Sequence, residues 1–94
     1  MRFKELIVEG EKIVGEHRIV MTLEQIGFNW LIDSEIENAC CEIKNNTLIW
    51  HSGDFISGNW HYGIFKSGNF YGNFKNGIFE GTNFKGKFLS GVKI

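Results

Sequence analysis

The sequence predicts a mainly β protein, built as a short right-handed β-solenoid with a small N-terminal α/β or β cap. Three observations carry this prediction. Aromatic residues recur about every five positions in the second half of the chain, glycines recur with the same period, and the 94 residues include 12 Gly and no Pro. So much glycine excludes a helix. The odd period excludes one long strand, because successive aromatics would then alternate between its two faces.

The chain length favours one compact domain, and charge divides that domain near Thr47. Residues 1–47 carry five Lys or Arg against nine Asp or Glu, whereas residues 48–94 carry five against two. We therefore expect an acidic capping and oligomerisation segment at 1–47 and a basic repeat segment at 48–94. The opposite charges could dock the halves on each other or join identical chains head to tail.

The first half predicts a mixture of short elements. Residues 3–14 are compatible with a helix, from their apolar spacing, or with a hairpin, because Glu-Gly-Glu-Lys at 9–12 suits a tight turn. Residues 17–21 predict a strand. Thr22, followed by Gln25, resembles a capping box that opens a short helix toward Ile32.

A hairpin is expected to lead into the repeat. Residues 39, 41 and 43 share one face of an alternating stretch, Asn45-Asn46 tolerates a left-handed turn, and residues 48–50 begin a second strand. Cys40 and Cys41 are adjacent and point to opposite faces of a strand, so they cannot easily form one disulfide or chelate one ion. We expect both to be reduced.

The repeat unit reads Gly-x-(Phe/Trp)-x-x. Its ring positions form the expected structural stack: Trp50, Phe55, Trp60, Phe65, Phe70, Phe74, Phe79, Phe84 and Phe88. A square coil with four units per turn places all these rings inside a solenoid. A β-meander with one aromatic face is the alternative, and a disordered, self-associating tract is a third interpretation.

The four-unit coil predicts which residues stack on one another. Phe70 would lie over Trp50, and the outward residues would place Lys66 beside Lys85 and His61 beside Glu80. Such a solenoid has little more than two coils and open strand edges at both ends. Residues 1–47 would cover one end, and a second copy would pair with the other. We therefore expect a homo-oligomer.

Several units resemble the pentapeptide-repeat family, whose unit has a small residue, Asp or Asn, a central Leu or Phe and two variable positions. Thr82-Asn83-Phe84-Lys85-Gly86 fits throughout, and Gly72-Asn73-Phe74-Lys75-Asn76 fits closely. The array is also similar to Gly-x-Trp-x-x-Gly repeats of small tailed-phage proteins. These resemblances imply a rigid flat face that binds another macromolecule, and a phage-type accessory or host-directed protein. Family members that bind DNA gyrase mimic an acidic duplex, whereas this repeat half is basic.

No catalytic motif is present. His17, His51 and His61 lack metal-ligand spacing, and the glycines are dispersed through the repeat rather than gathered in one phosphate-binding loop. We expect a non-enzymatic protein without metal or cofactor. The first residues lack the features of a signal peptide, and no apolar run approaches the ~20 residues that cross a bilayer. The sequence therefore predicts a cytoplasmic protein, in the host cytoplasm if phage-encoded, with no membrane partner.

The leading functional expectation is a module that binds a host or phage protein. Nucleotide or nucleic-acid binding is the alternative, because lysines interleave with aromatics. The candidate binding residues for such a surface are His61, Lys66, Tyr71, Lys75, Lys85 and Lys87. A self-assembling structural protein is a third hypothesis, and Trp30, Trp50 or Trp60 could serve a carbohydrate site.

Overall fold

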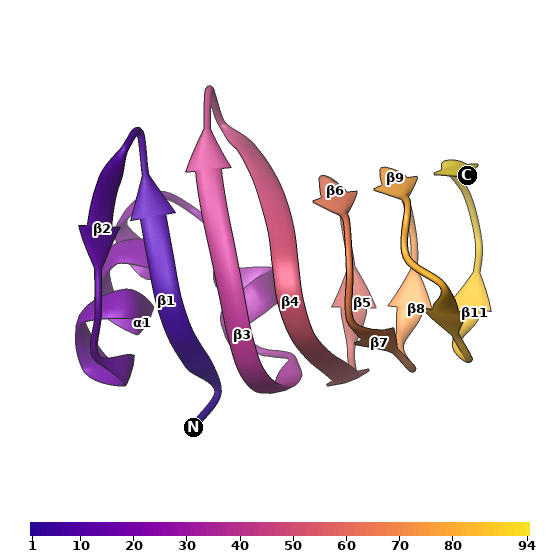
Figure 1. Ribbon diagram of the computed structural model, residues 1–94, viewed down its shortest axis with the longest axis horizontal. Coiled ribbons are helices and arrows are strands. Elements are labelled where there is room, and N and C mark those ends of the chain that lie inside the picture. Colours follow the sequence, from indigo (N-terminus) through magenta and orange to yellow (C-terminus); the bar gives the residue numbers. More distant parts are fainter.

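In a computed structural model of residues 1–94, a β-sheet with two helices on one face runs directly into a stack of short strands (Figure 1). The first half contains β1 (Phe3–Val8), β2 (Glu11–Ile13), α1 (Glu16–Gln25), α2 (Asn29–Ile32), β3 (Glu35–Lys44) and β4 (Thr47–Ser57). The second half contains β5 (Asn59–Trp60), β6 (Ile64–Phe65), β7 (Asn69–Phe70), β8 (Asn73–Phe74), β9 (Ile78–Phe79), β10 (Asn83–Phe84), β11 (Lys87–Phe88) and β12 (Val92–Lys93). The predicted β-solenoid with an N-terminal cap is confirmed.

Residues 3–13 form a hairpin rather than a helix. β1 and β2 pair antiparallel, and the chain reverses at Glu9 and Gly10, whose φ values of 46° and 85° are left-handed. Glycine adopts such a conformation without a steric penalty, which explains the Glu-Gly turn.

The strand predicted at 17–21 is wrong, because these residues lie in α1. Ile19 and Leu23, four positions apart, are both fully buried on one face of the helix. Burial of this helical stripe outweighs the β propensity of the Ile-Val pair. The Thr22 cap is also wrong, since the Thr22 hydroxyl donates to the Arg18 carbonyl oxygen inside α1 (2.8 Å). A left-handed Gly27 (φ 89°) then separates α1 from α2, so the helix expected over 22–32 is divided.

The hairpin of β3 and β4 follows the sequence pattern. Ala39, Cys41 and Ile43 are buried on one face of β3, and the turn residues Asn45 and Asn46 have φ values of 52° and 61°. These predictions are confirmed.

β4 bends at Gly53 and forms two successive sides of the first coil. Its residues 49–50 pair with β6, and its residues 54–55 pair with β7. β3 follows the bend through a register shift between Glu37 and Cys40, where Asn38 has a φ of 55°. A Cβ on Gly53 would lie 2.7 Å from the Asn38 oxygen, so the two strands can approach at this corner only because residue 53 is glycine.

The coil has three sides, and the predicted four units per coil are wrong. We name the sides by their stacked rings, which lie in register on neighbouring parallel strands. Side A stacks Trp50, Phe65 and Phe79; side B stacks Phe55, Phe70 and Phe84; side C stacks Trp60, Phe74 and Phe88. Lys93 follows Phe79 on side A, so the stack comprises about three turns instead of little more than two.

The nine rings fill the interior of the coil. Within a column, ring centroids lie 4.9–5.9 Å apart and the rings are nearly parallel. Rings on different sides meet edge to face, as Phe55 and Trp60 do at 78°. Both arrangements are favourable for aromatic pairs. Phe84 and Phe88, in the last coil, are half-buried, and the other seven rings are fully buried.

The N-terminal segment covers the first coil. β3 pairs along sides A and B, and α2 brings Trp30 against side C, where its ring lies 5.4 Å from that of Trp60. Ser34 packs beside Gly58, whose Cβ would lie 2.6 Å from the Ser34 hydroxyl. The first ring layer is therefore closed on all three sides.

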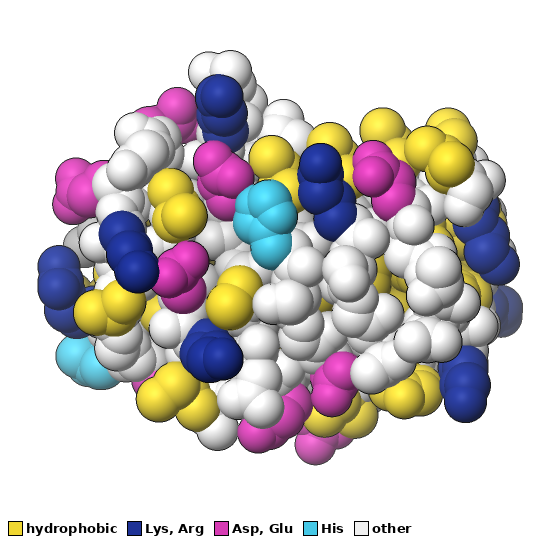
Figure 2. Space-filling model, viewed as in Figure 1, with side chains coloured by type: hydrophobic (Ala, Val, Ile, Leu, Met, Phe, Trp, Pro, Cys, Tyr) yellow, Lys and Arg dark blue, Asp and Glu magenta, His cyan; other side chains and the backbone are white.

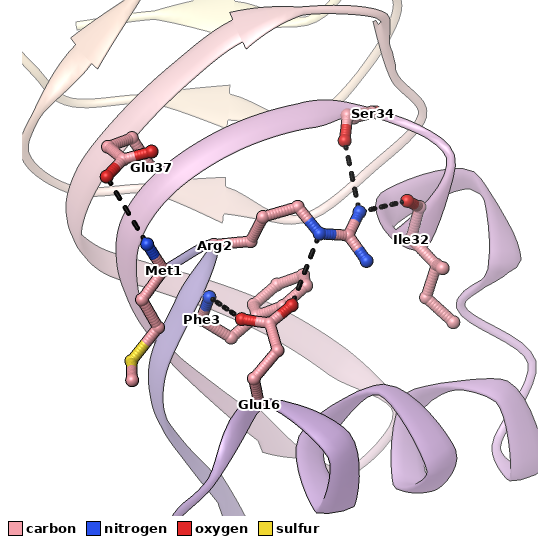
Figure 3. Close-up of polar contacts among 7 residues, drawn as sticks. All are labelled: Met1, Arg2, Phe3, Glu16, Ile32, Ser34 and Glu37. Carbon is pink, nitrogen blue, oxygen red and sulfur yellow. Dashed lines mark hydrogen bonds and ion pairs between the residues drawn. The ribbon is translucent and has the colours of Figure 1, made fainter.

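A polar cluster ties the start of β1 to both helices (Figure 3). The Glu16 carboxylate accepts from the Phe3 backbone N–H (2.8 Å) and from the Arg2 guanidinium (3.2 Å). Arg2 also donates to the Ile32 carbonyl oxygen at 2.6 Å. These contacts join β1, the first turn of α1 and the end of α2 into one cap.

Candidate interaction surface

The residue after each ring points outward, because side chains alternate along a strand. Three exposed columns result: His51, Lys66 and Glu80 on side A; Ile56, Tyr71 and Lys85 on side B; and His61, Lys75 and Leu89 on side C. The predicted ladders are therefore wrong. Lys66 and Lys85 lie on different sides, and so do His61 and Glu80.

The residue before each ring also differs by side. Ile49, Ile64, Ile78 and Val92 align on side A, Asp54, Asn69 and Asn83 on side B, and Asn59, Asn73 and Lys87 on side C. The Asn69 amide donates to Asp54 Oδ1 (2.8 Å), and the Asn73 amide donates to Asn59 Oδ1 (3.2 Å). These side-chain contacts connect successive coils on sides B and C.

Side C brings together three of the six candidate binding residues: His61, Lys75 and Lys87. Tyr71 and Lys85 belong to the side B column, and each directly precedes the glycine at the corner leading into side C. Lys66 lies apart from the others on side A. Five of the six candidates therefore lie on side C or at its border.

Side C also differs from the other sides in charge. Its residues, 58–62, 72–76 and 86–90, include two lysines and one histidine but no Asp or Glu. Side A carries Glu80, and its His51 pairs with Glu42 of β3 at 3.0 Å. Side B carries Asp54. Figure 2 shows the face over β3, β4, β6 and β9, where acidic and basic side chains intermix, with lysines gathered toward the last coil. Side C is the acid-free face of the solenoid.

The large rings are not available to stack on a ligand. Trp50 and Trp60 are fully buried. Trp30 is half-buried, and its ring is stacked against that of His61, with centroids 5.3 Å apart and planes 17° apart. Only the rings of Tyr62 and Tyr71 are well exposed on or beside side C, at 41% and 45%.

Neither a pocket nor a cluster of three or more potential metal ligands is present. The two cysteines are free thiols, as expected, with Cys41 buried and Cys40 half-buried. Burial raises the pKa of the Cys41 thiol far above its ordinary value, with a smaller contribution from neighbouring Cys40.

Comparisons of the chain with protein-family models, curated proteins and solved structures returned no match. The repeat arrangement is that of a β-solenoid, which is compatible with a repeat protein. Neither helix is long and apolar enough to traverse a lipid bilayer.

The sequence contains a signal for three sides that the four-unit interpretation missed. The two four-residue steps between rings, Phe70 to Phe74 and Phe84 to Phe88, lie 14 residues apart, which is three units rather than four. Both fall at the corner between sides B and C. The short units therefore mark the period of the coil instead of interrupting it.

Proposed function

We propose that this protein is a non-catalytic binding module that docks side C onto an acidic surface of another protein. The observation that supports the proposal is the gathering of Lys75, Lys87 and His61, bordered by Lys85, on a side whose own residues include no Asp or Glu. The chain as a whole has a formal charge of −1, so this basic surface is local. A local patch of one sign selects a partner of opposite charge and orients its approach.

The backbone holds this surface rigid before any partner arrives. Lys75 N–H donates to the Trp60 oxygen, and Leu89 N–H donates to the Phe74 oxygen, both at 2.8 Å. Successive coils are thereby spaced about 4.8 Å apart, as in any sheet. A rigid surface loses little conformational entropy on binding, which favours affinity.

A protein partner fits the geometry better than a nucleotide or a nucleic acid. Single-strand binding relies on exposed rings that stack on bases, and here the repeat rings fill the core. A nucleotide site requires a concave pocket, and the surface has none. The resemblance to phage repeat arrays supports a host or phage protein as the partner, bound in the cytoplasm.

The test compares two variants with equal charge change. Lys75→Glu/Lys87→Glu reverses side C, whereas Lys44→Glu/Lys66→Glu reverses two exposed lysines, at the end of β3 and on side A. Wild type and both variants are immobilised at equal density, and binding of polyglutamate and of single-stranded DNA is measured by surface plasmon resonance. Partners retained from cells are identified by native mass spectrometry, with the 260/280 absorbance ratio read on each sample.

We expect the side C variant to bind polyglutamate at least tenfold more weakly than wild type and to lose any stoichiometric acidic protein partner. The control variant should retain both. Equal retention by the two variants overturns the role of side C. A retained nucleic acid, seen as excess absorbance at 260 nm and lost in the side C variant, overturns the protein partner and supports the alternative.

A further inference from the structure

The main path of the longest sheet ends in two strands that have a neighbour on one side only. The order along this path is β12-β9-β6-β4-β3-β1-β2, with β7 and β10 on a branch from β4, so β12 and β2 are the edges of the path. They lie at opposite ends of the long axis of the molecule (Figure 1). Each therefore presents unpaired backbone N–H and C=O groups that can accept another strand.

The two edges have compatible directions. β2 is antiparallel to β1, β1 is parallel to β3, and β3 is antiparallel to β4. β4, β6, β9 and β12 are parallel to one another. β2 and β12 consequently run the same way, and a second copy translated along the sheet would bring its β2 against β12 as a parallel pair.

The side chains at these edges are also compatible. One row of register partners crosses the whole sheet on its buried face: Ile13, Leu6, Cys41, Trp50, Phe65, Phe79 and Lys93. Continuing the sheet in register places Lys93 beside Ile13 of the next copy. Glu11, two residues before Ile13 on the same face, then lies diagonal to Lys93, roughly 8 Å away between Cα atoms, because parallel strands lie about 4.8 Å apart and rise about 3.3 Å per residue. In the single chain the Lys93 ammonium lies over the Phe84 ring, 4.6 Å from its centroid. A lysine side chain that turns away from this ring spans the distance to Glu11.

Charge favours joining unlike ends. The last coil carries Lys85, Lys87 and Lys93, so pairing two last coils would oppose like charges. At the other edge, Lys12 of β2 is paired with Glu5 at 3.1 Å, which leaves Glu11 as the unpaired charge of β2. Apolar side chains are exposed near both edges: Val92 (57%) and Ile94 (78%) at β12, and Val14 (51%) after β2.

We infer that the protein self-associates head to tail, with the β12 edge of one copy adding to the β2 edge of the next. The strand pairing is made by β12 and β2, whereas Lys87 of side C only lies in the same end coil, so the inference does not depend on the proposed function. The molecular extents of 26 and 20 Å across the long axis allow each end to bury roughly 500 Å², at the low end for specific interfaces. Because the contact is heterologous, association continues past the dimer.

The experiment is sedimentation velocity on the full chain over a concentration series, at low and at high salt. We expect the weight-average mass to rise with concentration past twice 10.8 kDa at low salt and to fall at high salt. Lys93→Glu and Glu11→Lys should each weaken association at least tenfold. The double variant Lys93→Glu/Glu11→Lys should restore it, and Lys44→Glu, which matches the charge change of Lys93→Glu, should leave it unchanged.

Three results would overturn the inference. A wild-type mass that stays at 10.8 kDa throughout the series excludes the contact, and a mass that stops at twice this value shows a closed dimer. If the double variant Lys93→Glu/Glu11→Lys does not recover association, Lys93 and Glu11 are not neighbours across the contact. Circular dichroism of each variant confirms that the fold is retained, because both side chains lie on edge strands.

Discussion

At the scale of single residues, the stacked rings contribute most where they have neighbours both above and below. Phe74 is fully buried between Trp60 and Phe88, at centroid distances of 5.9 and 5.3 Å. Phe74→Ala should lower the free energy of unfolding by about 3–5 kcal/mol, because it removes a large buried ring and leaves a cavity. Lys75→Ala, at the next, exposed position, should change it by less than about 0.5 kcal/mol. Chemical denaturation measures both, and equal small effects would contradict ring stacking in the core.

The buried thiol of Cys41 predicts a loss of stability at alkaline pH. Burial raises its pKa above the ordinary value of 9.0, so above pH 9 the unfolded chain loses this proton while the folded chain keeps it. The free energy of unfolding therefore falls as pH rises beyond 9, by at most about 1.4 kcal/mol per pH unit from this group. Cys41→Ala should flatten this part of the pH profile, measured by urea denaturation. An unchanged slope would assign the alkaline loss to other groups.

At the scale of elements, corner glycines allow the coils to approach each other. Gly77 has a φ of 119°, and a Cβ there would collide with the Gly63 carbonyl oxygen of the coil before. Gly10 also has a positive φ, of 85°, but a Cβ there would meet nothing within 4 Å. Gly10→Ala should thus cost about 1 kcal/mol from backbone strain alone, whereas Gly77→Ala should cost several-fold more. Thermal unfolding of both variants tests the difference, and similar costs would show that the coils can separate at the corner without penalty.

The five-residue repeat can be recognised in the sequence, but this period alone does not determine the number of units per coil. Five-residue spacing is the same for any number of sides, because it records only the distance between corners. The short steps after Phe70 and Phe84, and the aliphatic residues at 49, 64 and 78, carry the longer period of 14 or 15 residues. The grouping of residues into side C depends on this longer period. The lack of Asp and Glu on side C could therefore be recognised only once the three-sided coil was known.

Only those elements of the cap that depend on local sequence could be predicted. Its hairpins follow from turn residues that are local in sequence, such as Asn45-Asn46. α1 instead depends on burial of Ile19 and Leu23 by the sheet, a tertiary effect that outweighs the local strand propensity of Ile19-Val20. A tertiary contact also determines the structure of residues 3–14. β1 pairs with β3, with Leu6 in register with Cys41, and this pairing favours the hairpin over the helix.

At the scale of the whole molecule, the cap and the solenoid are parts of one sheet. β4 pairs with β3 on one edge and with β6 and β7 on the other, so strand pairing continues across the boundary at residue 47. In a stack, each coil is stabilised by its neighbours, and an end coil has only one. Stability should consequently be greatest in the cap and first coil, and lowest in β10, β11 and β12, each of which pairs with one strand.

This gradient in stability predicts that backbone amides exchange with solvent by two routes, local opening and global unfolding. Amides of the last coil, such as Lys85 and Leu89, should exchange through local opening, whereas Lys66 and Tyr71, which donate to β4, should require global unfolding. Arg2→Ala removes the bonds to Glu16 and Ile32 and should lower global stability by about 1 kcal/mol, since this cluster is partly exposed. Hydrogen exchange followed by NMR should then show Lys66 and Tyr71 exchanging about fivefold faster, with Lys85 and Leu89 unchanged. Uniform acceleration at all four amides would mean that the last coil opens only with the rest of the molecule.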